Sequence, residues 1–301
     1  MSFTTLISTG VLAEHLDRVA APPSRDASTE RAFAIVDCRF KLDDVPWGQR
    51  MYREGHIPGA VYAHLDLDLS GPKTGANGRH PLPDPSTLID TFGRLGISSE
   101  DQVVAYDQDN GMFASRLWWL LRWLGHDRVA VLDGGFAKWA RERAEDGGEV
   151  RRPIAVGDEH RPARIFSGTP RPNMLVDVED VRAALTNRAL RLIDARAPER
   201  YRGDHEPIDR VPGHIPGAIN HFFQSNVDAN GSFRDAEELR RGLRQSIGSL
   251  QPENTICYCG SGVTACHNLL ALEHAGLHGA KLYAGSWSEW ASDPSRPIER
   301  G

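Results

Sequence analysis

The hexapeptide Gly55-His-Ile-Pro-Gly-Ala60 recurs without change as Gly213-His-Ile-Pro-Gly-Ala218 in the other half of the chain. Before each copy lies a short apolar run that ends in Asp-x-Arg: Ala34-Ile-Val-Asp-Cys-Arg39 in the first half and Leu192-Ile-Asp-Ala-Arg196 in the second. Short apolar runs bounded by turn residues are typical of buried β-strands. Because glycine and proline fix the backbone angles that a turn requires, we interpret both hexapeptides, with their histidines, as structural elements.

Two further landmarks follow each hexapeptide in the same order. Val103-Val-Ala-Tyr-Asp107 corresponds to Thr255-Ile-Cys-Tyr-Cys259, and each of these runs leads into a Gly-containing loop and then a helical pattern. Val131-Leu-Asp-Gly-Gly-Phe136 corresponds in the same way to Leu282-Tyr-Ala-Gly-Ser-Trp287. Self-similarity along so much of the chain indicates a tandem duplication.

Strand and helix patterns alternate within each repeat. Short Val, Ile and Leu runs are followed by stretches of helical periodicity, such as 114–124 and 263–275. This alternation predicts an α/β fold with two tandem domains, each a parallel sheet flanked by helices on both faces. We expect an N-terminal domain over 1–148, a turn- and Pro-rich linker over 149–170 and a C-terminal domain over 171–301.

Composition excludes several classes of protein. Hydrophobic residues make up 40% and charged residues 25% of the 301 residues, which is typical of globular proteins. A net charge of −6 argues against nucleic acid or an anionic membrane as the main partner. The sequence has no apolar run of the roughly 18 residues that a membrane span needs, and it begins without the pattern of a secretory signal. We therefore expect a cytoplasmic protein.

The strand-to-helix loops differ between the repeats, and the difference points to chemistry. The first repeat has Asp107-Gln-Asp-Asn-Gly111, whereas the second has Cys259-Gly-Ser-Gly-Val-Thr264. Backbone N–H groups of such a loop can surround a sulfur atom, and the positive end of the following helix stabilises a thiolate. Cys259 is therefore the candidate nucleophile, and the first repeat, which lacks it, is expected to be catalytically inert.

The four cysteines allow other interpretations. Four cysteines in a chain of this length do not make a disulfide framework. Cys257 and Cys266 are interpreted as packing thiols, although each could trap an oxidised Cys259 as a disulfide. A zinc site is disfavoured because no C-x-x-C pair is present; its ligands would be Cys257, Cys259, Cys266 and His267. A cysteine phosphatase would need Cys-x5-Arg, and Ala265 occupies the arginine position.

The two hexapeptides, the Cys259–Ala265 loop and Gly285-Ser-Trp-Ser-Glu-Trp290 together resemble the tandem-rhodanese sulfurtransferases over nearly the whole chain. The form of the loop resembles the 3-mercaptopyruvate branch, because the thiosulfate-using branch usually has basic residues at the positions of Gly260 and Ser261. The resemblance implies a persulfide on Cys259, with no metal and no organic cofactor. The backbone amides of Gly260, Ser261, Gly262, Val263 and Thr264 would hold the anionic sulfur.

The resemblance also implies residues that bind the donor. Two arginines hold the donor's carboxylate and keto group in mercaptopyruvate enzymes, which suits the forked guanidinium. Arg200 falls where the first belongs. Arg210 is available for the second, but it lies closer to the Gly213 turn than the family pattern has it, and a solvated surface charge is the alternative.

A proton relay is implied in the same way. Asp66 and His80 match positions at which the mercaptopyruvate branch builds a Ser–His–Asp relay with the loop serine, here Ser261. Because Asp66 and His80 belong to the first repeat, we expect the active site to lie in a cleft between the halves. A histidine beside a proline is otherwise an ordinary loop residue.

The expected function is transfer of sulfane sulfur from 3-mercaptopyruvate through Cys259 to a thiol or cyanide. The thiol acceptor would be a small redox protein or a low-molecular-weight thiol. The alternative is a thiosulfate:cyanide sulfurtransferase, which differs in its donor only. A non-catalytic sulfur-binding or regulatory module is the reading that the first repeat alone would support, and Cys259 argues against it for the whole chain.

Overall fold

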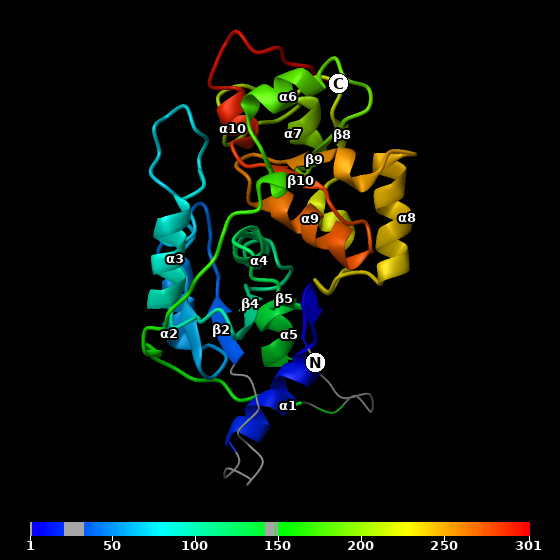
Figure 1. Ribbon diagram of the computed structural model, residues 1–301. Helices are drawn as coiled ribbons and strands as arrows, with labels where there is room; N and C mark the ends of the chain where they lie inside the picture. Colours follow the sequence, from blue (N-terminus) through cyan, green and yellow to red (C-terminus); the bar gives the residue numbers. More distant parts are fainter. Residues whose placement is uncertain (1, 21–32, 142–147, 149) are drawn as a thin grey trace. The chain divides into compact units, whose positions relative to one another are not determined.

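The computed structural model describes residues 2–20, 33–141, 148 and 150–301 (Figure 1). These residues form two compact units, and neither unit is one continuous stretch of sequence. The first unit comprises Met1–Asp68, Pro85–Thr169 and Ala229–Ser232. The second comprises Leu69–Asp84, Pro170–Asp228 and Phe233–Gly301. A segment from the first half of the sequence, Leu69–Asp84, therefore packs with the second unit.

Each unit is built on a five-stranded sheet in which every pair of neighbouring strands is parallel. The strand order is β1-β5-β4-β2-β3 in the first unit and β6-β10-β9-β7-β8 in the second. The two sheets have the same topology, because each strand of the second order is the counterpart of the strand at the same place in the first order. The predicted α/β fold with tandem parallel sheets flanked by helices is confirmed.

The elements of the first unit are β1 (Leu6–Ile7), α1 (Thr9–Ala20), β2 (Phe33–Asp37), α2 (Trp47–Glu54), β3 (Ala60–Tyr62), α3 (Pro85–Arg94), β4 (Gln102–Tyr106), α4 (Ala114–Trp123), β5 (Val129–Leu132) and α5 (Gly135–Arg141). Those of the second unit are η2 (Pro172–Met174), β6 (Leu175–Val176), α6 (Val178–Ala184), β7 (Arg191–Asp194), α7 (Pro198–Arg202), β8 (Ile219–Asn220), η3 (Phe223–Asn226), α8 (Ala236–Ile247), η4 (Pro252–Asn254), β9 (Thr255–Tyr258), α9 (Thr264–His274), β10 (Lys281–Tyr283) and α10 (Ser286–Trp290).

The strand ends are joined to the hexapeptides by the same hydrogen bonds in both units. Arg39 forms an ion pair with Asp37 at the end of β2, and its Nη2 donates to the carbonyl of Gly55 (2.6 Å). Arg196 forms the equivalent ion pair at the end of β7 and donates to the carbonyl of Gly213 (2.7 Å). The Asp-x-Arg motif therefore fixes the hexapeptide turn against the sheet, which explains why both copies carry both motifs.

The hexapeptide histidines pack in the same way. His56 stacks on Tyr52 with 4.2 Å between ring centroids, and His214 stacks on Tyr201 at 3.8 Å. Each Nδ1 also lies 2.8 Å from the carbonyl oxygen of the tyrosine on which the ring stacks. Both rings are thus held by packing and by a backbone hydrogen bond, as expected of structural histidines.

The predicted linker is described from residue 150 onward, while position 149 lies outside the described residues. Its backbone hydrogen-bonds to the first unit: Ala155 exchanges two bonds with His56 (2.9 Å each), and the N–H of Arg164 donates to Gly93 (2.9 Å). The linker up to Thr169 therefore runs extended along the first unit.

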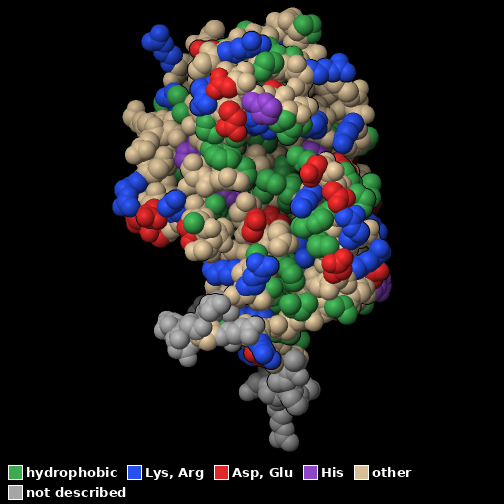
Figure 2. Space-filling view, turned by 180° about the vertical axis from the view of Figure 1, so that it is seen from behind, with side chains coloured by type: hydrophobic (Ala, Val, Ile, Leu, Met, Phe, Trp, Pro, Cys, Tyr) green, Lys and Arg blue, Asp and Glu red, His purple; other side chains and the backbone are tan. Residues whose placement is uncertain are grey.

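The side chains agree with a globular protein that has mixed surface charge. Large aromatic residues such as Trp139, Trp287 and Trp290 are fully buried against their own sheets. On the face shown in Figure 2, Lys and Arg side chains are interspersed with Asp and Glu. In the described part of the chain, no helix has both the length and the apolar character needed to cross a membrane.

Candidate active site

The loop between β9 and α9 surrounds the sulfur atom of Cys259. The side chain is nearly buried, with 2% of its surface exposed. Its Sγ accepts hydrogen bonds from the backbone N–H groups of Gly262 (3.1 Å) and Ser261 (3.4 Å). Of the five loop amides expected to hold the sulfur, the structure brings these two to it. In the described part of the chain, the amides of Gly260, Val263 and Thr264 form no hydrogen bond to this sulfur. The helix α9 begins at Thr264, with its positive end at the loop.

Glycine is required at position 262 for two reasons. Its φ of +77° lies in the left-handed region, where a side chain is strained. A Cβ atom there would also lie 2.4 Å from the carbonyl oxygen of Ala284. The loop therefore has this shape only because residue 262 has no side chain.

Gly262→Ala should lower the free energy of unfolding by about 2–4 kcal/mol, since backbone strain and the collision with Ala284 add together. Gly242→Ala is the matched control, because Gly242 lies inside α8 and a Cβ there meets no atom within 4 Å. That control should stabilise the protein by about 0.5–1 kcal/mol through helix propensity. Urea unfolding of both variants tests this, and a midpoint for Gly262→Ala as high as that of Gly242→Ala would contradict it.

Hydrogen bonds with the start of α10 hold the loop in place. The N–H of Cys259 donates to Ser286 Oγ (3.1 Å), and the hydroxyl of Ser286 in turn donates to the carbonyl of Tyr283 (2.9 Å). The carbonyls of Cys259 and Gly260 accept from the N–H groups of Trp287 (2.9 Å) and Ser288 (3.0 Å). Ser286 has a φ of +57°, unusual for a residue with a side chain. The hydroxyl that holds the Cys259 amide is thus placed at the expense of backbone strain.

The segment Leu69–Asp84, drawn in cyan in Figure 1, brings a histidine to the loop. His80 Nδ1 lies 2.7 Å from Ser261 Oγ, and both side chains are more than nine-tenths buried. The N–H of the preceding Arg79 donates to Ser288 Oγ (3.0 Å), which ties the segment to α10. The predicted association of His80 with Ser261 is therefore present within the second unit.

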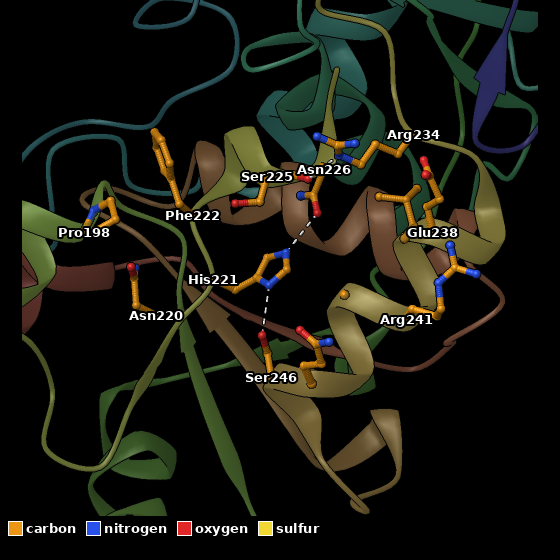
Figure 3. Close-up of a pocket in the computed structure, with 13 residues that line it drawn as sticks. Pro198, Asn220, His221, Phe222, Ser225, Asn226, Arg234, Glu238, Arg241 and Ser246 are labelled. Atoms are coloured by element: carbon orange, nitrogen blue, oxygen red, sulfur yellow. Dashed lines mark hydrogen bonds between the residues drawn. The ribbon is translucent and has the colours of Figure 1, made fainter. Parts of the chain in front are cut away.

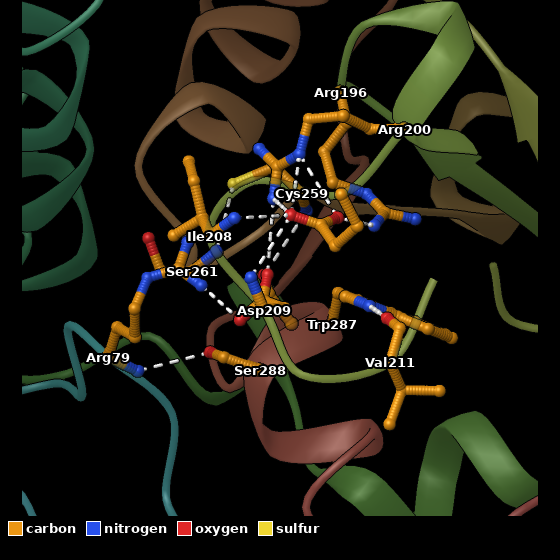
Figure 4. A network of polar contacts seen from close by, with 12 residues as sticks. Arg79, Arg196, Arg200, Ile208, Asp209, Val211, Cys259, Ser261, Trp287 and Ser288 are labelled. Carbon is orange, nitrogen blue, oxygen red and sulfur yellow. Dashed lines mark hydrogen bonds and ion pairs between the residues drawn. The ribbon is translucent and has the colours of Figure 1, made fainter. Parts of the chain in front are cut away.

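Two arginines lie over Gly260, the residue next to Cys259. A Cβ atom on Gly260 would lie 2.7 Å from Arg79 Nη2 and 3.4 Å from Arg200 Nη2. Both guanidinium groups form ion pairs with Asp209, to which Arg200 donates at 3.1 Å (Figure 4). Arg200 also pairs with Glu206 (2.8 Å). Burial acts to raise the pKa of Glu206, but hydrogen bonds from Arg200 and from the Asp209 N–H outweigh it, so the pKa lies below its usual value.

Arg210 and Asp66 are the remaining predicted site residues. Arg210 is exposed, and among the described residues no hydrogen bond or ion pair joins it to the Cys259 loop. Asp66 is half-buried in the first unit, where its backbone N–H donates to His64 Nδ1 (3.1 Å). Sequence reasoning missed Arg79 and Asp209. The only signal for Arg79 was its position beside His80, and Asp209 carried none.

The first unit has a carboxylate at the position of the cysteine. Asp107 follows β4, and its oxygens accept from the N–H groups of Gly111 (2.9 Å), Phe113 (2.7 Å) and Ala114 (3.1 Å). Burial raises the pKa of Asp107 to about 6, although these three bonds act to lower it. The corresponding loop of the first unit thus also surrounds an acceptor atom, but one that cannot form a persulfide.

The other two cysteines of the second unit are packed. Cys257 is fully buried in β9, and burial raises the pKa of its thiol far above the usual value. Cys266 is also fully buried, and its Sγ donates to the carbonyl of Gly262 (3.3 Å). A buried neutral thiol is a poor nucleophile. These environments agree with the interpretation of both as packing residues.

A separate cavity of about 550 Å³ opens in the second unit (Figure 3). His221 in its wall is fixed by two neighbours: its Nδ1 lies 2.9 Å from Ser246 Oγ and its Nε2 lies 3.0 Å from Asn226 Oδ1. Burial lowers the pKa of His221. None of the predicted site residues lines this cavity, whose walls comprise Pro198, Asn220, His221, Phe222, Ser225, Asn226, Arg234, Glu238, Leu239, Arg241, Gly242, Gln245 and Ser246.

Comparison with known proteins identifies the class of protein that this fold and loop define. The model of the rhodanese-like domain matches the chain twice, over residues 22–142 and 177–293. The chain therefore belongs to the rhodanese-like family and carries two copies of its domain, which confirms the resemblance drawn from the motifs.

Individual relatives cover almost the whole chain. The probable 3-mercaptopyruvate sulfurtransferase of Pseudomonas aeruginosa is 46% identical over 276 residues, which are 91% of this chain and 94% of that protein. The putative thiosulfate sulfurtransferase SseB of Mycobacterium tuberculosis is 38% identical over 273 residues, 89% of this chain and 91% of that protein. Among solved structures, the 3-mercaptopyruvate sulfotransferase SseA of Escherichia coli matches with a TM-score of 0.75 and 30% identity, covering 95% of this chain and 99% of its own.

Proposed function

We propose that the protein is a sulfurtransferase that takes sulfur from 3-mercaptopyruvate, carries it as a persulfide on Cys259 and delivers it to a thiol or to cyanide. The observation that carries the proposal is the position of the Cys259 sulfur between two backbone N–H donors, beside a pair of arginines. Relatives named for this reaction support the choice of donor, while the relative named for thiosulfate makes thiosulfate the second candidate.

The loop favours a charged sulfur. The N–H groups of Ser261 and Gly262 point at Sγ, and the N-terminus of α9 adds its positive potential. Such groups donate hydrogen bonds and positive potential to a sulfur that carries negative charge. The same donors remain in place for a persulfide, so that no rearrangement is needed during the reaction.

Arg79 and Arg200 would hold the donor's carboxylate. Their guanidinium groups are close enough to Gly260 to contact a Cβ atom there, and so a carboxylate bound to them lies beside the nucleophile. A guanidinium binds a carboxylate through two parallel hydrogen bonds, which fixes both position and orientation. In this arrangement Arg79 has the role that the sequence suggested for Arg210.

Transfer to the enzyme forms one bond and breaks another. The Cys259 thiolate attacks the thiol sulfur of 3-mercaptopyruvate, an S–S bond forms, and the C–S bond breaks with its electron pair moving to the enolate of pyruvate. The Ser261 hydroxyl gives a proton to the carbon from which the sulfur has left. It recovers a proton through His80, whose Nδ1 lies 2.7 Å from the serine Oγ. The products are pyruvate and the Cys259 persulfide.

A second nucleophile completes the cycle. A thiolate or cyanide attacks the outer sulfur of the persulfide, and the Cys259 thiolate leaves as the S–S bond breaks. A thiol acceptor, either a small redox protein or a low-molecular-weight thiol, would be abundant in the reducing cytoplasm that the cysteine content suggests. Neither half-reaction consumes an external oxidant.

Steady-state sulfur transfer with both donors tests the proposal. Gly260 and Ser261 add no positive charge for a dianion such as thiosulfate, whereas a keto acid with one carboxylate suits the fork of the arginine pair. We expect kcat/KM to favour 3-mercaptopyruvate over thiosulfate by about tenfold or more, which corresponds to about 1.4 kcal/mol of transition-state stabilisation. Equal or better use of thiosulfate would establish the second candidate instead.

A further inference from the structure

Asp209 occupies the arginine pair in the way that a bound carboxylate would. One of its oxygens pairs with Arg79 and the other with Arg200 (3.1 Å), so a single carboxylate bridges both guanidinium groups. Only 7% of the Asp209 side chain is exposed, compared with 27% for Arg79 and 15% for Arg200. Figure 4 shows the three side chains in one network with the loop of Cys259 and Ser261.

The backbone that carries Asp209 is held independently of its carboxylate. The N–H groups of Ile208 and Asp209 both donate to Glu206 Oε1 (3.1 Å each), and Glu206 also pairs with Arg196 (3.3 Å). The chain from 206 to 209 is therefore held by contacts that do not involve the Asp209 carboxylate.

The charges at this point are balanced. Two guanidinium groups, on Arg79 and Arg200, face two carboxylates, on Glu206 and Asp209, and Arg196, which also contacts Glu206, is balanced by Asp194. If a ligand's carboxylate replaces that of Asp209, the balance is kept. If a dianion replaces it, one negative charge is left over in a site that is largely shielded from water, where uncompensated charge is unfavourable.

We propose that Asp209 is an internal competitor of the donor: its carboxylate occupies Arg79 and Arg200, and the donor's carboxylate has to displace it in order to bind. The inference rests on the proposed function, because it takes these arginines as the donor site and Cys259 as the nucleophile. Asp209 acts through the arginines and touches no reacting atom, and it is therefore a positioning residue.

Alkylation of Cys259 tests the competition without any sulfur donor. Iodoacetate carries a carboxylate and iodoacetamide does not, so the ratio of their rates at Cys259, measured by peptide mass spectrometry, reports access of a carboxylate to the arginines. Asp209→Asn should raise this ratio about tenfold, the effect of removing one hydrogen-bonded charged competitor. Loosening of the fold accelerates both reagents and leaves the ratio unchanged.

Asp204→Asn is the matched control. It removes the same charge from the same loop, but Asp204 is exposed and pairs with Arg202, outside the network. Its rate ratio should equal that of the parent. An unchanged ratio in Asp209→Asn, or an equal rise in Asp204→Asn, would overturn the inference.

Kinetics separate this inference from the proposed function. In Asp209→Asn, KM for 3-mercaptopyruvate should fall about tenfold, whereas kcat should change far less, because the competitor acts on binding. The preference over thiosulfate should stay as in the parent, since a dianion still leaves one negative charge uncompensated when the Asp209 carboxylate is gone. A raised alkylation ratio in an enzyme that does not use 3-mercaptopyruvate would leave the competition standing and refute the donor. A KM that stays at the parent value would refute the competition.

Discussion

Cys259→Ser should reduce sulfur transfer by about 10³-fold or more, because a serine hydroxyl at neutral pH neither ionises nor forms a persulfide. The substitution is nearly isosteric, and the N–H donors of Ser261 and Gly262 can bond to oxygen as they do to sulfur. The fold should therefore be retained. Steady-state assays and circular dichroism on the same preparation separate loss of chemistry from loss of structure.

Cys257→Ser is the control for this prediction. Cys257 lies two residues back in β9 and is fully buried, and its thiol has a pKa raised far above the usual value by that burial. The control variant should lose stability, because a hydroxyl is placed in an apolar core, and should keep its sulfur transfer while folded. Transfer that survives in Cys259→Ser and is lost in folded Cys257→Ser would show that the wrong cysteine has been assigned.

His80→Ala should lower kcat with 3-mercaptopyruvate by about 10²-fold, which is typical for a positioned acid–base group. The reason is the 2.7 Å contact between His80 Nδ1 and Ser261 Oγ, which would return a proton to the serine after each transfer. KM should change far less, since the donor's carboxylate is bound by Arg79 and Arg200 and not by His80. Measurement of kcat and KM separately is thus essential.

Ser261→Ala provides the companion measurement. If Ser261 and His80 form one relay, removing either loses about the same factor, and the double variant is no worse than the poorer single variant. Losses that multiply in the double variant, or a His80→Ala enzyme with the kcat of the parent, would mean that the two residues do not act as one relay.

The sequence alone determined the fold and the identity of the reactive loop. Strand and turn signals are local, because apolar runs, glycine and proline act on the backbone within a few residues. Two copies of the Asp-x-Arg strand end and of the hexapeptide therefore indicated two equal domains. The comparison of the copies then isolated Cys259, since Asp107 stands in its place in the first repeat and the structure gives both residues the same kind of surroundings.

Which charged side chains meet at the site was decided by tertiary structure. Arg79 and Arg210 are both arginines near a glycine-rich turn, and no local pattern distinguishes them. Arg79 reaches Gly260 because the segment Leu69–Asp84 packs with the second unit, through contacts such as that of the Arg79 N–H with Ser288. The role of Asp66, which lies in the first unit, stays a prediction.

The pairing of Asp209 with both arginines was equally beyond the sequence. A long charged side chain takes the partners that folding brings within reach, and Asp209 is 9 positions from Arg200 but 130 positions from Arg79 along the chain. Periodicity and turn signals carry no information over such distances, because they report only the conformation of the local backbone. Local sequence signals thus identify the residue that can carry sulfur, whereas the packing of distant segments decides which charges surround it.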